Sequence, residues 1–514
     1  MYRILSASKD TYITDKIINN NFRATDANVG LAGTLDVFKL FEESSYMSGS
    51  TRITGSIVEL SRLLIKFDLE PLRKLTSSIL DYAHPSFNCT LKLHDVYGGQ
   101  TTPSNFKLIT FPLSHSFDEG VGRDVVSFSD VDSSNFVTAS VSGDSTVMWY
   151  LSGANRQGLI NSDDIDIIAS GNLYDGDGVK NLWSSQLFSS GDEDLSMDVT
   201  TIISATLANQ IPDHGFRISF SGTQESDNRS RFVKRFGSRH ANNTRIQPKL
   251  IIKYDDTVID HHRSFYFNTS GSLFLNNYLR GQSANLLTGT TGKLYGVSGS
   301  SCLVLRVVSG TYSSSFTGSQ HQIGDNFITG VYSASFLIDE FNVTSSLSDE
   351  IKYAGSATFK TYWESFDGTV GYYTGSFVAN TIRRTAFNNT PSRLFINITN
   401  LRRSYRKDDE VKLRVFVENI DRAVVAKKLP LETKSEIFTK MYYRVRDYDS
   451  NTVIIPFDTQ KESTRLSTDS DGMYFKFYMD SLSMGRTYVF DFLIKDQGND
   501  QVFTDVAAKF RVEG

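Results

Sequence analysis

Three tryptophans are the side chains best suited to hold a ligand in this chain. Trp149, Trp183 and Trp363 each carry a flat aromatic ring, and an exposed ring of this kind stacks on the C–H-rich face of a sugar. Packing in a core, or against another subunit, is the alternative role for the same rings. We therefore treat the three tryptophans as candidate glycan or subunit contacts.

Motifs for nucleophilic catalysis or phosphate binding are absent from the sequence. It contains no Gly-x-Ser-x-Gly turn of the kind that presents a catalytic serine. The stretch TGTTGKL is similar to a phosphate-binding loop, but Leu294 follows Lys293 where a Ser or Thr is required. Paired carboxylates for glycoside hydrolysis have no fixed sequence spacing, so they stay open as an alternative. We expect a chain with no catalytic residue, no enzyme activity and no cofactor.

The sequence also contains no clear set of metal ligands. The eight histidines are dispersed, and none has the spacing of a zinc site. Carboxylates gather in several turns, and such oxygens suit calcium. These turns contain Asp163, Asp164 and Asp166; Asp175 and Asp177; Asp192, Glu193 and Asp194; and Asp469 and Asp471. Exposed Asp–Gly turns are the simpler interpretation, and one structural Ca²⁺ at an unassigned place is the alternative.

The net charge and the length of the apolar runs limit the kinds of partner that this chain is expected to bind. The chain has 514 residues and a net charge of −5, which does not favour nucleic acid, because binding to phosphates needs a basic excess. No apolar run is long enough to span a bilayer, so we expect no membrane insertion. The first residues, MYRILSASKDTYIT, lack the charged and apolar regions of a secretory signal. Cys89 and Cys302 are far apart and in apolar stretches, so both are expected to be small buried hydrophobes.

The elements that must position these residues are mainly β-strands. Apolar and polar residues alternate in segments bounded by Gly, Ser, Asn and Asp, and aromatic residues make up 12% of the chain. Clear examples are CTLKLHDVY, GFRISFSG, PKLIIKYDD, VKLRVFVEN and MYFKFYMD. The pattern predicts an all-β, multi-domain fold of jelly-roll or β-sandwich type, with a C-terminal immunoglobulin-like sandwich and few short helices.

Short helices are predicted at three places. They lie in DVTTIISATLAN with Asp198 as N-cap, in SDEIKYAG between Ser348 and Gly355, and near TKSEIFTKMY, where Thr433 and Glu436 have capping-box spacing. Three segments follow from composition: a first domain over 1–256, a second β-rich domain over 264–392 and an immunoglobulin-like sandwich over 393–514. Whether the middle segment is an independent domain is left open.

The first segment contains an ordered series of weak motifs. It begins with Asp10 and Tyr12 in an Asp-Thr-Tyr-Ile strand, followed by an Asn-x-Gly turn at Asn28 and Gly30 before LDVFKL. The series continues with Arg62, Phe67 and Asp68 in RLLIKFDL, then CTLKLHDVY, Asp198 and Thr200 in Asp-Val-Thr, a His-Gly-Phe strand, Arg239 after a serine, and Pro-Lys-Leu. In this order, the motifs resemble those of the DNRLRE family of β-sandwich modules, which overlaps carbohydrate-binding module family 96. The family module is shorter, so insertions are expected around residues 40–58 and 130–190.

The resemblance implies a jelly-roll-like sandwich, and the types and positions of the motif residues themselves predict structural roles. Asp68 would cap backbone N–H groups or pair with Arg62, and the Asn28–Gly30 turn would tolerate a positive φ. The resemblance also implies, more weakly, binding of a polysaccharide.

Taken together, these features predict a non-enzymatic structural protein of a bacteriophage particle, in its tail, neck or baseplate region. Its partners would be other virion proteins and further copies of itself, with a cell-surface glycan as a candidate ligand. It would be assembled in the host cytoplasm and located in the virion. The alternative is a polysaccharide-binding protein of the family that the first segment resembles.

Overall fold

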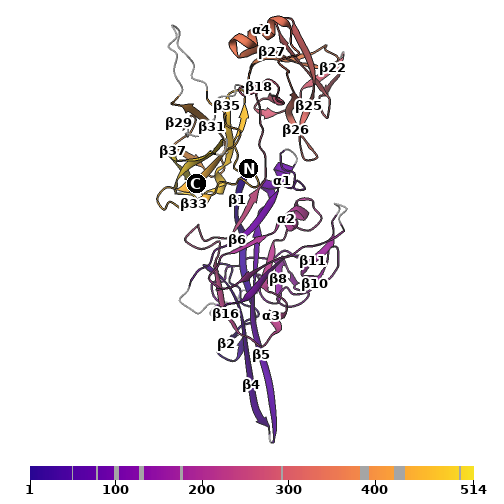
Figure 1. Cartoon of the computed structure of the whole chain (residues 1–514). Helices are drawn as coiled ribbons and strands as arrows, with labels where there is room; N and C mark the ends of the chain where they lie inside the picture. The colour runs from indigo at the N-terminus through magenta and orange to yellow at the C-terminus, as the bar shows by residue number, and fades with distance from the viewer. Residues whose placement is uncertain are drawn as a thin grey trace. The chain divides into compact units, whose positions relative to one another are not determined.

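The computed structural model describes residues 1–48, 50–76, 79–97, 103–126, 132–173, 178–290, 293–382, 393–421, 435–496 and 499–514. The described chain is built mainly of β-strands with a few short helices, which confirms the predicted all-β, multi-domain β-sandwich class. Contacts divide it into two compact units, whose strands Figure 1 labels. The first unit consists of Arg3–Lys74 and Phe87–Lys253, and the second of Met1–Tyr2, Leu75–Ser86 and Tyr254–Gly514.

The first unit is organised by one ten-stranded sheet. Eight strands follow the order β13-β7-β15-β5-β1-β17-β6-β14, and β4 continues from β5 to β16. Their bounds are β1 Tyr2–Thr14, β4 Thr34–Ser48, β5 Thr51–Phe67, β6 Asn88–Leu93, β7 Phe106–Pro112, β13 Ser184–Phe188, β14 Leu195–Asp198, β15 Phe216–Phe220, β16 Arg231–Gly237 and β17 Lys249–Lys253. In β6, Cys89, Leu91 and Leu93 are buried while the residues between them are less so, as the alternation predicted.

The insertion expected around residues 130–190 forms small sheets of its own. These sheets are β8 Thr138–Ser142 with β9 Ser145–Met148, and β10 Gln157–Leu159 with β11 Ile167–Asn172 and β12 Val179–Asn181. Trp149 and Ile167 from this region pack in one apolar cluster with Leu64 and Phe111 of the main sheet. A further hairpin pairs β2 Ile17–Ile18 with β3 Phe22–Arg23.

Helices in the first unit are short. They are α1 Glu70–Thr76, α2 Thr200–Leu207 and α3 Thr223–Ser226. Asp198 was predicted as the N-cap of α2, but Val199 has that place and the helix begins at Thr200, one residue later than expected. The Asp198 carboxylate still accepts a hydrogen bond from the Thr200 N–H at 2.9 Å. No helix in the described part of the chain is long and apolar enough to cross a membrane.

The second unit contains a seven-stranded sheet in the order β18-β28-β27-β24-β25-β26-β19. The bounds are β18 Phe265–Tyr266, β19 Gly271–Asn276, β24 Leu303–Ser309, β25 Tyr312–Ile323, β26 Asn326–Phe336, β27 Ser356–Ser365 and β28 Gly371–Asn380. The two end strands are consecutive in the chain, and Gly271 approaches the Phe265 ring so closely that a Cβ there would lie 2.5 Å from a ring carbon. The sheet therefore curls around its aromatic core, which contains Trp363 and Phe359.

Smaller elements complete this part of the second unit. They are the two-stranded ribbons β20 Tyr278–Leu279 with β21 Gln282–Ser283 and β22 Leu287–Thr290 with β23 Lys293–Gly296, and the helix α4 Ser345–Ala354. Gly355 ends α4 in the left-handed conformation, φ 69°, as predicted. The start differs, because α4 begins at Ser345 rather than after Ser348.

Residues 394–513 form two facing sheets, of immunoglobulin-like type as predicted. One has the order β29-β31-β35-β34 and the other β30-β37-β36-β32-β33. The bounds are β29 Leu394–Ile398, β30 Ser404–Arg406, β31 Glu410–Asn419, β32 Met441–Asp447, β33 Val453–Ile455, β34 Ser467–Asp469, β35 Gly472–Tyr478, β36 Thr487–Asp496 and β37 Asn499–Glu513, and the 3₁₀ turn η1 covers Met479–Ser481. The rings of Tyr443 and Phe475, one from each sheet, stack with centroids 4.5 Å apart. The independence of segments 264–392 and 393–514 as domains stays a prediction.

The helix predicted near TKSEIFTKMY is not formed in its described part. Thr433 lies outside the described residues, and residues 435–438 are not helical. Instead, the Glu436 N–H donates to the Val417 carbonyl at 2.8 Å, and the Ser435 hydroxyl accepts from the Val417 N–H at 3.0 Å. The segment thus satisfies its backbone groups against β31, which competes with the local helix signal.

Candidate functional site

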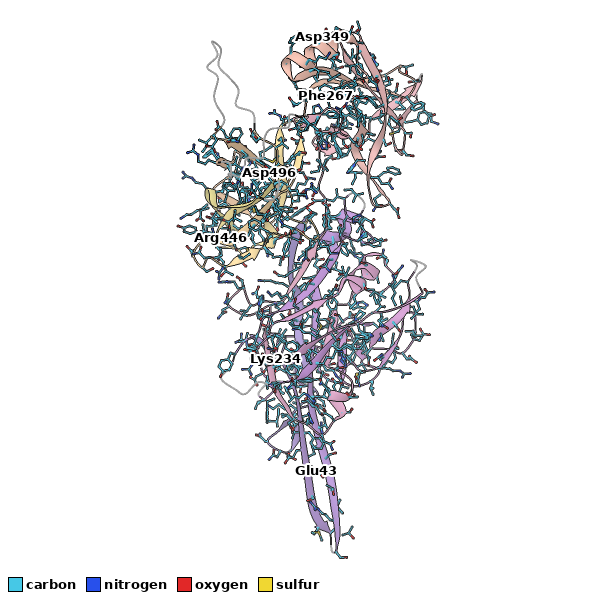
Figure 2. All side chains as sticks on the ribbon, viewed as in Figure 1. Glu43, Lys234, Phe267, Asp349, Arg446 and Asp496 are labelled. Carbon is cyan, nitrogen blue, oxygen red and sulfur yellow. The ribbon has the colours of Figure 1, made fainter. Side chains whose placement is uncertain are left out.

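Strands β4 and β5 continue past the main sheet as a two-stranded ribbon. We call residues 42–56 the arm. Their backbone pairs run from Glu43 opposite Ser56 to Ser48 opposite Thr51. Every arm residue whose side chain is described is exposed. Figure 1 shows both strands extending beyond the other strands of their unit, and Figure 2 labels Glu43 on this stretch.

Both backbone edges of the arm are open among the described residues. Strand β16 pairs with β4 only between Thr34 and Lys39. On the other side, β1 and β15 pair with β5 only from Ser61 onward. Open edges present rows of N–H and C=O groups, which another strand can pair with. The arm is therefore a surface suited to adding strands from another molecule.

The arm has little to stabilise it within its own unit. Its exposed apolar side chains include Met47, 63% exposed, and Ile53, 39% exposed, and most of its other residues are Ser, Thr and Gly. A two-stranded ribbon that buries no apolar face is only marginally stable in water. A binding partner would cover these side chains and supply the missing stabilisation.

The base of the arm, in contrast, is held by a partly buried ion-pair cluster. The Lys39 side chain is fully buried, and its ammonium group donates to the Asp227 carboxylate at 2.7 Å and to the Asp227 carbonyl. Arg231 donates to both carboxylate oxygens of Asp227, at 2.8 and 2.6 Å. The Arg231 hydrogen bonds, aided by Lys39, hold the pKa of Asp227 well below its usual range.

A second contact set ties β4 to its two neighbours. Arg235 on β16 donates to both oxygens of Asp36 at 2.8 Å. The Ser61 hydroxyl on β5 donates to the Asp36 carbonyl at 2.7 Å and accepts from the Phe38 N–H at 2.9 Å. These contacts hold β4 between β16 and β5 at the point where the exposed ribbon begins. A force applied to the arm would therefore be transmitted to the main sheet.

Four of the motif residues meet in a polar cluster with Glu119. Arg239 donates to both oxygens of Glu119, at 2.5 and 2.7 Å, and its backbone N–H donates to Asp10 at 2.6 Å. The Asn28 amide donates to the Glu119 carbonyl at 2.8 Å and accepts from the Gly30 N–H at 3.0 Å. These contacts cross-link segments that are far apart in the sequence, which fits the structural role predicted for the motif residues.

Two details of this cluster differ from what the sequence suggested. Gly30 does not have a positive φ; glycine is needed there because a Cβ would lie 1.9 Å from the Glu119 carbonyl oxygen. Asp10 is fully buried, and burial together with the charge of Glu119 raises its pKa to about 7, although the Arg239 N–H opposes this. Glu119 carries no sequence signal of its own, so sequence reasoning missed it.

The other motif residues lie elsewhere in the first unit. Arg62 does not contact Asp68; it donates to both oxygens of Glu225, at 3.0 and 2.9 Å. Asp68 instead caps α1, since its carboxylate accepts from the Glu70 N–H at 3.0 Å. Tyr12 is buried in β1.

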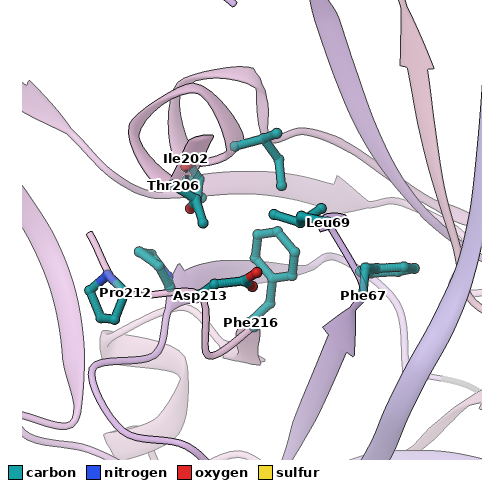
Figure 3. Close-up of a pocket in the computed structure, with 10 residues that line it drawn as sticks. Phe67, Leu69, Ile202, Thr206, Pro212, Asp213 and Phe216 are labelled. Atoms are coloured by element: carbon teal, nitrogen blue, oxygen red, sulfur yellow. Dashed lines mark hydrogen bonds between the residues drawn. The ribbon is translucent and has the colours of Figure 1, made fainter. Parts of the chain in front are cut away.

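Phe67 packs beside a small cavity under α2. Figure 3 shows its ring near Leu69 and Phe216, and the Phe67 and Phe216 rings meet edge to face at 6.3 Å. The cavity volume is about 10 Å³, roughly one water molecule. This cavity is too small for a ligand and belongs to the core packing.

The three tryptophans separate clearly by exposure. Trp149 is buried and donates from its indole N–H to the Asn135 carbonyl at 3.0 Å, and Trp363 is fully buried in the core of the seven-stranded sheet. Neither ring is accessible to a sugar. Trp183 is 40% exposed, so of the three candidates it alone presents its ring at a surface.

Acidic turns do not converge on a metal site in the described part of the chain. No group of three or more His, Cys, Asp or Glu residues there is arranged to hold an ion. Asp166 accepts from three backbone N–H groups, and Asp469 pairs with Lys412 and Arg414. Asp175 and Asp177 lie outside the described residues. Cys89 is buried as expected, whereas Cys302 is only half-buried.

Comparison with known proteins yields likeness in fold only. No family model and no curated protein matches the chain. Among solved structures, the tandem Ig repeats of Dlar are 11% identical, with a TM-score of 0.13 over 48% of this chain and 92% of that chain. Titin-A168169 is 6% identical, with a TM-score of 0.14 over 50% of this chain and 94% of that one. The two tandem V-type regions of VCBP3, a v-region-containing chitin binding protein, are 6% identical, with a TM-score of 0.13 over 49% and 95%. TM-scores this low carry no argument about function.

Proposed function

We propose that the chain is a non-enzymatic structural component of a larger assembly, and that this assembly is the tail, neck or baseplate region of a bacteriophage particle. The arm carries the proposal. It combines open strand edges and exposed apolar side chains with a base held by the partly buried Lys39–Asp227 pair. This arrangement suits a partner that adds a strand to an open edge of the arm and exerts a force on it.

Further features support an assembly role. The chain is composed of several β-sandwich modules, which provide stiff bodies and many surfaces for neighbours. Partners of this kind would be other virion proteins and further copies of the chain around the particle axis. The protein would then be located in the virion, after assembly in the host cytoplasm.

The test is mass spectrometry of purified phage particles from the source, with copy number measured against the major capsid protein. We expect a fixed stoichiometry of about 3, 6 or 12 copies per particle, as cyclic symmetry requires. A variant with a shortened arm, in which Asn-Gly joins Ser44 to Gly55, should fold but be missing from particles. Absence of the wild-type chain from particles would refute the proposal, and normal incorporation of the short-arm variant would refute the role of the arm.

A second candidate function is polysaccharide binding. One observation favours it: Trp183 is half-exposed and lines a cavity whose wall also contains Arg217 and Glu225. An attachment protein of a particle can have both functions. Binding of the purified chain to immobilised glycans tests this candidate separately.

A further inference from the structure

The cavity beside Trp183 has the size and construction of a small-ligand site. Its volume is about 270 Å³, close to the lower end of the roughly 300–1,000 Å³ typical of small-molecule pockets. It lies in the first unit, over the face of β7 and β15 that carries Phe111 and Arg217. The polar part of its wall comes from Asn155, Gln157 and Glu225.

Trp183 supplies an aromatic surface at this cavity. It lies between β12 and β13 and leaves 40% of its area exposed. Large aromatic side chains are usually mostly covered, as the other two tryptophans are. The electron-rich face of an indole attracts the slightly positive C–H groups on the flat side of a pyranose ring.

Arg217 forms a buried, charged part of the cavity wall. Its side chain is only 3% exposed. One terminal nitrogen donates to the Asn155 side-chain oxygen at 3.0 Å, but no acceptor among the described residues reaches the buried Nε. A buried N–H without an acceptor is rare in folded proteins. Solvent does not reach this Nε either, so Arg217 contributes to the cavity as part of its wall and as a fixed charge.

The positive and negative charges around the cavity are equal in number. This balance favours an uncharged ligand over an anion. Arg62 pairs with both oxygens of Glu225, and Arg217 lies 4.0 Å from the same carboxylate. Asp166 is fully buried and also acts on Arg217 electrostatically. Burial, and then the charge of Arg62, lowers the pKa of Arg217 to about 9, so it stays protonated at neutral pH. Two guanidinium groups therefore face two carboxylates, and an added anion would gain no net attraction.

We propose that this cavity binds one uncharged pyranose ring of a neutral glycan. The flat face of the ring lies on Trp183, and a hydroxyl oxygen accepts from the Asn155 side-chain amide in the cavity wall. Other hydroxyls bond to the Gln157 amide and to the Glu225 carboxylate, whose lone pairs exceed the two used by Arg62. This inference rests on the second candidate function, polysaccharide binding, and adds the site and the class of sugar.

The experiment uses the full chain on an array that carries neutral oligosaccharides beside their carboxylated, sulfated and phosphorylated counterparts. Titration calorimetry with the strongest neutral binder then compares three variants with the wild type. Trp183→Ala should weaken binding at least about tenfold, and Trp183→Phe should keep most of it, because a smaller aromatic face remains. Phe232→Ala removes an even more exposed aromatic residue of the same unit that does not line the cavity, so its affinity should not change.

Each of the other outcomes contradicts a different part of the proposal. Neutral-glycan binding that survives Trp183→Ala overturns this site but leaves polysaccharide binding intact. Selective binding of charged glycans overturns the ligand class. Failure of every glycan on the array overturns both the inference and the second candidate function. Thermal melting of each variant separates lost binding from lost folding.

Discussion

Lys39 and Asp227 are 188 residues apart in the sequence, yet the Lys39 ammonium nitrogen lies 2.7 Å from an Asp227 carboxylate oxygen at the base of the arm. The lysine side chain is fully buried, and Asp227 also holds Arg231. One carboxylate therefore pairs with two cations where the ribbon leaves the sheet. This explains how a long, exposed hairpin keeps a fixed point of attachment.

Loss of that carboxylate should destabilise the first unit. In Asp227→Ala, Lys39 stays buried without an acidic partner, although the carbonyl of residue 227 still accepts one hydrogen bond. We expect the free energy of unfolding to fall by about 2 kcal/mol, measured by urea denaturation. The matched control is Asp421→Ala, which breaks the surface pair with Arg393 and should leave the denaturation midpoint unchanged. Equal effects of the two variants would contradict the role assigned to the Lys39–Asp227 pair.

Two glycines of the same turn region should differ in their tolerance of alanine. At Gly30, a Cβ would lie 1.9 Å from the Glu119 carbonyl oxygen, so the backbone must move and the polar cluster with it. Gly30→Ala should lower the free energy of unfolding by about 2 kcal/mol or more. At Gly33, no atom comes within 4 Å of the new Cβ, and Gly33→Ala should change stability by less than about 0.5 kcal/mol. Thermal melting of both variants checks the pair, and a tolerated Gly30→Ala would contradict the close approach.

Asp10 should make stability depend on pH near neutrality. Burial raises its pKa from 3.8 to about 7, so between these values the folded chain holds a proton that the unfolded chain releases. This contribution to stability is complete below pH 3.8 and is lost as the pH rises through about 7. Over that window the wild type should lose about 1.4 kcal/mol per pH unit relative to Asp10→Asn, whose amide does not ionise. Urea denaturation at several pH values measures this difference, and parallel curves for the two proteins would contradict it.

Shortening the arm should not affect folding. The variant with Asn-Gly between Ser44 and Gly55 removes an even number of residue pairs, so the pair beside the new two-residue turn has the same hydrogen-bonding type as the pair beside the old one. Because the deleted residues are exposed, the melting temperature should shift by less than about 2 °C. Calorimetry of the purified variant measures the shift. A large loss of stability would mean that the arm supports its own unit rather than a partner.

Alternation of residue types predicted strands well because it reflects burial on one face. The segments CTLKLHDVY, GFRISFSG and PKLIIKYDD became β6, β15 and β17, and VKLRVFVEN and MYFKFYMD became β31 and β35. Such patterns are local, and each strand shows them whatever its neighbours are. Residues 40–58, where an insertion was expected, contain the arm, but nothing in their composition indicated that they would form one.

Contacts between distant residues could not be predicted in the same way. Arg62 was paired with Asp68 as one option, but six residues of extended strand span about 20 Å, too far for an ion pair. Its actual partner, Glu225, is 163 residues away. Glu119 and Asp227 were missed for the same reason, since no sequence spacing encodes which carboxylate meets which cation. Trp183 could be proposed from its type, but its exposure depends on how the insertion folds over the sheet.

The position of β1 also determines when the first unit can fold. In the sheet, β1 lies between β5 and β17, and β17 ends at Lys253. A ribosome adds about 5–20 residues per second, so β1 emerges many seconds before one of its two neighbours exists. Until then its open edge is exposed to other nascent chains. Pairings of such long sequence separation form slowly, and we expect this unit to complete its sheet only after synthesis has passed residue 253, with a need for chaperones in the interval.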